Sequence, residues 1–148
     1  MAKWDDTTLS TATTIAQWET EINDYAESGS DWSDKITLAK KIIKRDIEEK
    51  LRSAGYTCDY ENDEEIINII NNADVFDLAS DCKTLELIYK DLSRGDTESD
   101  FGQKMMDYRD KYSVMFDKAM KNLNLDTDQD DETDAYASTV LSIGRQSR

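Results

Sequence analysis

Three aspartates near the end of the chain have the spacing most typical of metal chemistry. Asp126, Asp128 and Asp130 occur at every second position, as do the first ligands of an EF-hand calcium loop. The sixth position of such a loop needs glycine for its sharp turn and the twelfth needs a bidentate glutamate. Here those positions hold Asp131 and Ala137. We therefore expect a solvated acidic loop, with a specific calcium site or weak cation binding by crowded carboxylates as the alternatives.

The residue types argue against an enzyme. The chain has no histidine and only two cysteines, Cys58 and Cys82. The absence of histidine excludes Ser–His and Cys–His nucleophilic sites and histidine-ligated metals. The cysteines match no metal-ligand spacing, and adjacent carboxylates such as Glu48–Glu49 recur too often for any one pair to mark an acid–base pocket. We predict no catalytic residue, no metal ligand and no cofactor.

The charge balance limits the partners. Thirty-three acidic residues oppose eighteen basic ones in 148 residues, which gives a net charge of −15. Such a chain gains no affinity for nucleic-acid phosphates from its net charge, so we expect no non-specific DNA binding. No apolar run approaches the roughly 18 residues of a membrane span, and the first ten residues lack the apolar core of a signal peptide. We therefore expect a soluble protein that has no membrane partner.

Hydrophobic periodicity predicts a mainly α-helical fold: a bundle of about four long helices, one short helix and an extended C-terminal arm. Apolar residues recur at three and four positions, as on one face of a helix. The main helices are predicted from Thr8 or Ser10 to Ser28, from Ser33 to Gly55, from Asp74 to Gly95 and from Ser99 to Leu123, with the short helix over Asn62–Ala73. Trp18 and Trp32 are predicted in the core, whereas Trp4 is a candidate contact residue or hydrophobic staple.

The second predicted helix carries the main concentration of basic residues. Its basic face includes Lys40, Lys41, Lys44, Arg45 and Arg52. Acidic residues are interleaved with them, so pairs four residues apart, such as Lys44–Glu48, favour a salt-bridged face exposed to solvent. The alternative is a subunit interface, because an acidic protein that oligomerises needs basic patches to meet its acidic ones.

The chain changes character after Leu125. We expect a helical domain over residues 1–125, an acidic loop over 126–134 with six acids and no base, and an arm over 135–148. The arm alternates polar and apolar residues as an extended strand does. Its apolar side chains have no partner in the acidic loop, so the arm is expected to dock on another protein. The predicted docking residues are Tyr136, Val140, Leu141, Ile143, Arg145 and Arg148.

The order of these features resembles the head–tail connector proteins of tailed bacteriophages, also called adaptor or head-completion proteins. The resemblance covers roughly residues 33–148: the helix ADVFDLASDCKTLELIYKDL, the tyrosine-rich helix FGQKMMDYRDKYSVMFDKAMKNLNLD, the acidic loop and the arm. The residues that match the family pattern are Ala79, Leu85, Ile88, Tyr89, Asp91, Leu92, Tyr108, Tyr112, Leu123 and Leu125. The family's acidic loop often carries a glycine after the aspartates, and this loop has none.

The resemblance implies a structural virion protein. Such a subunit forms a homo-oligomeric ring of about twelve copies under the portal at the neck of the virion. The ring continues the DNA channel without specific DNA binding. The arm is expected to dock on the portal protein, and other faces are expected to meet a tail-side neck or tail-terminator protein. The subunit is expected to be made in the cytoplasm of the host bacterium.

Two other functions fit the sequence. One is an acidic inhibitor that mimics nucleic acid and blocks a DNA-binding enzyme, although mimicry needs carboxylates spaced like phosphates over a surface and the densest acidic run here is one loop. The other is a small helical regulatory protein.

Overall fold

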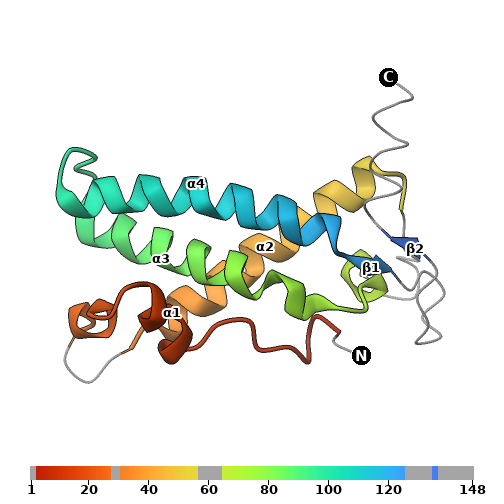
Figure 1. Ribbon diagram of the computed structural model, residues 1–148, viewed down its shortest axis with the longest axis horizontal. Coiled ribbons are helices and arrows are strands. Elements are labelled where there is room, and N and C mark those ends of the chain that lie inside the picture. The colour runs from red at the N-terminus through yellow and green to blue at the C-terminus, as the bar shows by residue number, and fades with distance from the viewer. Residues whose placement is uncertain (1–2, 28–30, 57–64, 126–134, 137–148) are drawn as a thin grey trace. The chain divides into compact units, whose positions relative to one another are not determined.

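The structure is a computed structural model that describes residues 3–27, 31–56, 65–125 and 135–136. The chain is mainly helical, as the hydrophobic periodicity predicts. Its elements are α1 (Ala12–Trp18), η1 (Ile22–Tyr25), α2 (Ser33–Ser53), η3 (Ile66–Ile69), η4 (Ala73–Phe76), α3 (Asp77–Ser93), α4 (Asp100–Lys121), β1 (Asn124–Leu125) and β2 (Ala135–Tyr136), where η denotes a short 3₁₀ helix (Figure 1).

The chain is divided into two compact units. The helical unit consists of Thr8–Ile42 and Phe76–Phe116. The strand unit consists of Met1–Thr7, Ile43–Val75 and Asp117–Arg148. Helices α2 and α4 each begin in the helical unit and end in the strand unit.

Aromatic packing between α3 and α4 forms the centre of the helical unit. The two helices lie side by side and run in opposite directions (Figure 1). The ring of Tyr89 on α3 stacks at 6.0 Å from both Phe101 and Tyr108 on α4. Each large apolar side chain that is fully buried contributes roughly 1.5–3 kcal/mol. The buried apolar residues of this unit are Leu9, Ile15, Ile22, Ala39, Phe76, Ala79, Cys82, Leu85, Ile88, Tyr89, Tyr108, Tyr112 and Phe116.

The strand unit contains a small antiparallel pairing between β1 and β2. Asn124 pairs with Tyr136 and Leu125 with Ala135 in antiparallel register. On its other side Leu125 forms a bridge with Ile70. The buried apolar residues of this unit are Trp4, Ile43, Ile47, Leu51, Ile66, Ile67, Ile69, Ile70, Ala73, Ala119, Met120, Leu123 and Leu125.

Two helix boundaries are confirmed down to their hydrogen bonds. Gly55 has φ +96°, the left-handed conformation in which glycine is favoured after a helix. Its N–H donates to the carbonyl of Arg52, and the N–H of Tyr56 donates to that of Leu51, both at 3.0 Å. The fourth long helix is predicted to begin at Ser99; the N–H of Gly102 in α4 donates to Ser99 Oγ at 3.1 Å, so Ser99 caps the start of this helix.

Two other boundaries differ from the prediction. The first predicted helix is split: α1 begins after the N-cap Thr11 and ends at Trp18, because Glu19 adopts an extended backbone. The prediction that Asp74 caps the third long helix is wrong, because the chain first makes the turn η4 and α3 begins only at Asp77. Of the short helix predicted over Asn62–Ala73, the described part forms η3.

Trp18 and Trp32, both predicted in the core, are half-buried. Each indole instead lies at the edge of the packed interior and uses its N–H as a donor: Trp18 Nε1 donates to Asp81 and Trp32 Nε1 donates to the carbonyl of Ile22. Trp4 is 3% exposed and therefore belongs to the core of the strand unit.

The backbone of Asp96 and Thr97 lies so close to Gly102 in α4 that an added methyl group at Gly102 is expected to lower stability. A Cβ at Gly102 would collide with the carbonyl oxygen of Asp96 and lie 2.7 Å from Thr97 Cα. Gly→Ala in an open helix interior stabilises by about 1 kcal/mol, but here overpacking dominates. We expect Gly102→Ala to lower the free energy of unfolding in urea by about 2 kcal/mol. Asp107→Ala on the exposed face of α4 is the control and should change it by less than about 0.5 kcal/mol. An unchanged or higher stability of Gly102→Ala would contradict this packing.

Candidate functional site

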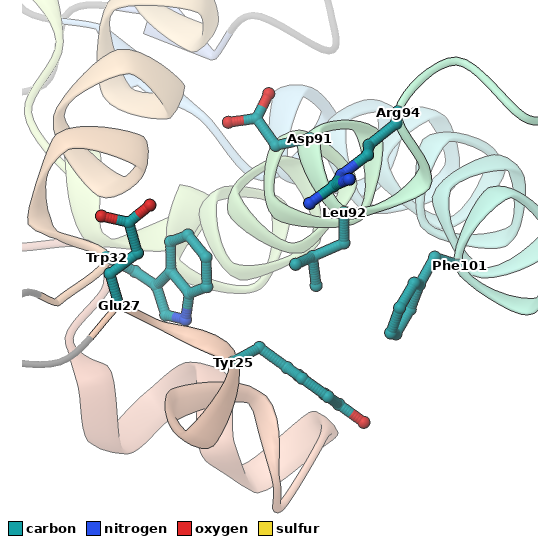
Figure 2. A pocket seen from close by; sticks show the side chains of 7 residues that line it. All are labelled: Tyr25, Glu27, Trp32, Asp91, Leu92, Arg94 and Phe101. Atoms are coloured by element: carbon teal, nitrogen blue, oxygen red, sulfur yellow. The ribbon is translucent and has the colours of Figure 1, made fainter.

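The helical unit contains an open pocket with aromatic walls. Its volume is about 540 Å³, and its apolar lining consists of Tyr25, Trp32, Leu92 and Phe101. Figure 2 shows Trp32 and Phe101 on opposite sides of the hollow, with Leu92 and Tyr25 between them. Tyr25 and Phe101 are in edge-to-face contact, with ring centroids 5.3 Å apart. The pocket is therefore a preformed apolar surface of the size that small ligands and side-chain anchors occupy.

Charged side chains complete the lining of the pocket. They are Glu27, Asp91 and Arg94. Asp91 forms an ion pair with Lys35 at the start of α2. Arg94 ends α3 with φ 51°, a left-handed conformation that is costly for a residue with a Cβ. Apolar walls with a few charged side chains are typical of pockets that bind small ligands or side chains of a partner.

No local pattern in the sequence predicts this pocket. Its apolar walls come from η1, from the residue before α2, from α3 and from α4. Trp32, predicted in the core, is half-buried, and Tyr25, which continues a helical apolar pattern, is 40% exposed. The pocket therefore depends on how these elements pack together, a tertiary arrangement that periodicity does not encode.

A carboxylate beside this pocket connects the end of α1 to α4. Glu19 accepts a hydrogen bond from Lys104 Nζ and another from Tyr108 Oη, each at 2.9 Å. The bond to Glu19 raises the pKa of Lys104 above its ordinary value. Burial, together with the bond to Glu19, raises the pKa of Tyr108 as well. The carboxylate of Glu19 therefore accepts hydrogen bonds from the cation of Lys104 and the neutral phenol of Tyr108. These bonds connect the end of α1 to α4.

A second carboxylate, Asp81 on α3, fastens the segment before α1. Asp81 is 4% exposed, and its Oδ1 accepts hydrogen bonds from Ser10 Oγ at 2.6 Å and Thr14 Oγ1 at 2.8 Å. Its Oδ2 accepts from Trp18 Nε1 at 3.2 Å. Burial raises the pKa of Asp81, and these three hydrogen bonds oppose the rise. Its three donors hold the carboxylate in place, so Asp81 has a structural role.

The predicted basic face lies on α2 with mixed pairing. Lys41, Arg45 and Arg52 are exposed, whereas Lys40 and Lys44 are half-buried. Lys44 forms its ion pair with Glu65 and not with Glu48, because the approach to η3 brings Glu65 to α2. This hydrogen bond raises the pKa of Lys44. Exposed Arg45 and Lys41 are the members best placed for the predicted subunit interface, which stays a prediction.

The buried thiol of Cys82 and the buried phenols of Tyr89 and Tyr108 make the stability of the fold depend on pH in the alkaline range. Burial raises the pKa of the Cys82 thiol from 9.0 to about 11 and raises that of Tyr89 and Tyr108. The unfolded chain loses these protons at lower pH than the folded chain. The stabilisation is therefore complete below pH 9.0 and is lost as the pH rises toward 11. We expect the urea midpoint to fall over this interval, and to fall less in Tyr108→Phe. An unchanged midpoint throughout the interval would contradict this coupling.

The predicted docking residues are placed only in part. Tyr136 lies in β2, paired with β1, so the start of the arm is fixed to the strand unit. Val140, Leu141, Ile143, Arg145 and Arg148 lie outside the described residues, as does the acidic segment 126–134 with its three regularly spaced aspartates.

The described parts of the chain hold no group of three or more carboxylate or cysteine side chains arranged to bind a metal ion. Among the same residues, no helix has the length and apolar character needed to cross a membrane. Comparison of the chain with protein-family models, with curated proteins and with solved structures finds no match.

Proposed function

We propose that the chain is a structural subunit of a bacteriophage head–tail connector. In this role, copies of the subunit form a ring between the portal and the tail, and the ring continues the DNA channel. The proposal assigns no catalytic role to any residue. The arm that follows Tyr136 binds the portal protein, and the exposed basic residues of α2 meet acidic surface on the next copy.

The pairing of β2 with β1 is the observation that carries this proposal. Ala135–Tyr136 is held antiparallel to Asn124–Leu125, which is itself bridged to Ile70 in the strand unit. The first residue of the arm to be placed in the fold is therefore held by backbone pairing with β1. A segment that links two proteins needs such a firm attachment to its own domain. In an extended conformation, the twelve residues that follow, 137–148, would be long enough to bind a partner by strand addition or groove docking.

The distribution of charge also supports the proposal. Exposed carboxylates dominate the described surface, and the net charge is −15. Negative charge along a channel repels phosphate, so DNA slides past without binding. Rings require head-to-tail contacts between different surfaces of neighbouring copies, for which Lys41 and Arg45 on α2 supply the basic side.

Ring formation tests this function. Purified chain at increasing concentration is examined by native mass spectrometry and negative-stain electron microscopy, with Lys41→Glu/Arg45→Glu as the interface variant and Lys118→Glu on α4 as the control. We expect closed rings that the interface variant prevents and the control retains. A chain that stays monomeric at all concentrations, with or without purified portal, and instead inhibits a DNA-binding enzyme would contradict the proposal and favour mimicry.

A further inference from the structure

The aromatic pocket of the helical unit has the properties of a docking site for a peptide. Trp32, Leu92 and Phe101 are half-buried and Tyr25 is 40% exposed, so each presents part of its apolar surface to the hollow (Figure 2). The rings are held in place: Trp32 Nε1 donates to the carbonyl of Ile22 at 2.8 Å. A site whose walls are already fixed binds an apolar anchor without a large ordering cost.

The surroundings of the pocket select a basic ligand. The two stretches of sequence that supply its lining, residues 20–35 and 91–101, contain nine carboxylates and two basic residues, Lys35 and Arg94. Among these acids, Glu27 and Asp91 line the pocket itself. Clusters of one sign attract ligands of the other sign and repel their own. The occupant should therefore combine apolar anchors with positive charge and carry no acid.

We propose that residues 137–148 of a second copy of this chain occupy the pocket. This segment, ASTVLSIGRQSR, has apolar side chains at Val140, Leu141 and Ile143, basic ones at Arg145 and Arg148, and no acid. It belongs to the longest acid-free stretch, residues 135–148, in a chain of net charge −15, and it carries two arginines, which makes it the best match to an acidic, apolar hollow. Twelve residues in extended form span about 40 Å, enough to leave β2 and reach a neighbouring molecule.

The arm then has two receptors, the pocket of another copy and the proposed portal site, which compete for it. Exchange of arms between copies requires no portal, so it is independent of the proposed role in the virion neck. In a connector, such exchange would keep the arm occupied until the portal displaces it.

The first test measures binding of a fluorescent peptide of residues 137–148 to the chain that lacks those residues. We expect saturable binding that weakens as salt rises. Tyr25→Ala and Leu92→Ala should each weaken it about tenfold. Leu78→Ala is the matched control, because Leu78 lies on the same helix α3, is 47% exposed and lies outside the pocket lining; it should leave binding unchanged. A peptide with Arg145→Glu and Arg148→Glu should bind at least about tenfold more weakly.

Substitution of Arg94 tests whether the ligand of the pocket is basic, because a loss of fold alone would not tighten binding. Because Arg94 is the basic residue in the lining of the pocket, Arg94→Gly should tighten peptide binding about threefold by removing a like charge. Glycine also suits the φ of 51° at this position, so the variant should fold at least as well. Weaker binding of the peptide to Arg94→Gly would overturn the assignment of a basic occupant.

The second test separates binding between copies from binding within one copy. A full-length chain with both Tyr25→Ala and Leu92→Ala supplies an arm with a strongly weakened receptor, and the chain truncated after Tyr136 supplies a receptor without an arm. Both chains also carry Lys41→Glu/Arg45→Glu, the variant expected to prevent ring formation. We then expect each to sediment as a monomer alone and the mixture to form a one-to-one complex. Absence of that complex, or absence of peptide binding to the truncated chain, would overturn the proposal, whether or not the chain binds a portal.

Discussion

Replacement of Asp81 by alanine is expected to lower the free energy of unfolding by about 3 kcal/mol. The side chain is 4% exposed and accepts hydrogen bonds from Ser10, Thr14 and Trp18. Without it, the three donors lose their acceptor, and the buried hydroxyl of Ser10 keeps only Ser80 Oγ, at 2.8 Å. Urea unfolding followed by tryptophan fluorescence measures the loss, and limited proteolysis should show earlier cleavage in residues 8–18.

Asparagine separates the hydrogen bonds from the charge. In Asp81→Asn the amide oxygen can occupy the position of Oδ1, which accepts from Ser10 and Thr14. Only the bond from Trp18 to Oδ2 is lost, so a cost of about 1 kcal/mol is expected. Asp110→Ala, at an exposed site on α4, should change stability by less than about 0.5 kcal/mol. Equal effects of Asp81→Ala and Asp110→Ala would show that Asp81 does not fasten α1 to α3.

Deletion of residues 137–148 is expected to leave the helical fold intact and to weaken portal binding by about 100-fold or more. All buried apolar residues of the described chain lie between Trp4 and Leu125, so the deletion removes none of them. Portal affinity depends on it because its apolar residues are the proposed anchors. Circular dichroism checks the fold, and co-sedimentation with portal-bearing heads measures the binding.

Two further variants test whether the arm itself, and not the pocket, is needed for portal binding. Tyr25→Ala in the full-length chain removes a wall of the pocket but keeps the arm, so it should bind portal-bearing heads normally. A Val140→Ala/Leu141→Ala double variant keeps the length of the arm and should bind weakly. If the truncated chain sediments with the heads as well as the intact chain does, the arm is not the portal anchor.

The parts of the fold that sequence predicted are those set by local physics. Ala39, Ile43, Ile47 and Leu51 repeat at four residues, and all are buried along α2. Gly55 ends that helix because only glycine adopts its left-handed backbone without cost. The cap at Ser99 likewise depends on neighbours in sequence. Each of these features needs only residues within one or two turns.

The parts that sequence did not predict depend on residues far apart in the chain. Glu19 ends α1 where its side chain meets Lys104 and Tyr108, more than 80 positions later. Asp81 stands next to the apolar stripe of α3, and its donors Ser10 and Thr14 lie about 70 positions earlier. The pocket has the same origin. Periodicity finds the faces of helices but not the polar contacts and hollows between them.

Immunogold electron microscopy of tailed particles assembled with the tagged chain tests the connector assignment most directly. The tag is placed at the N-terminus, away from residues 137–148 that the proposal assigns to portal binding. The account predicts gold at the neck, between head and tail, on particles that carry the full-length chain, and no gold on particles assembled with the truncated chain. Gold on the capsid faces or the tail tip, or tailed particles that never incorporate the full-length chain, would contradict it.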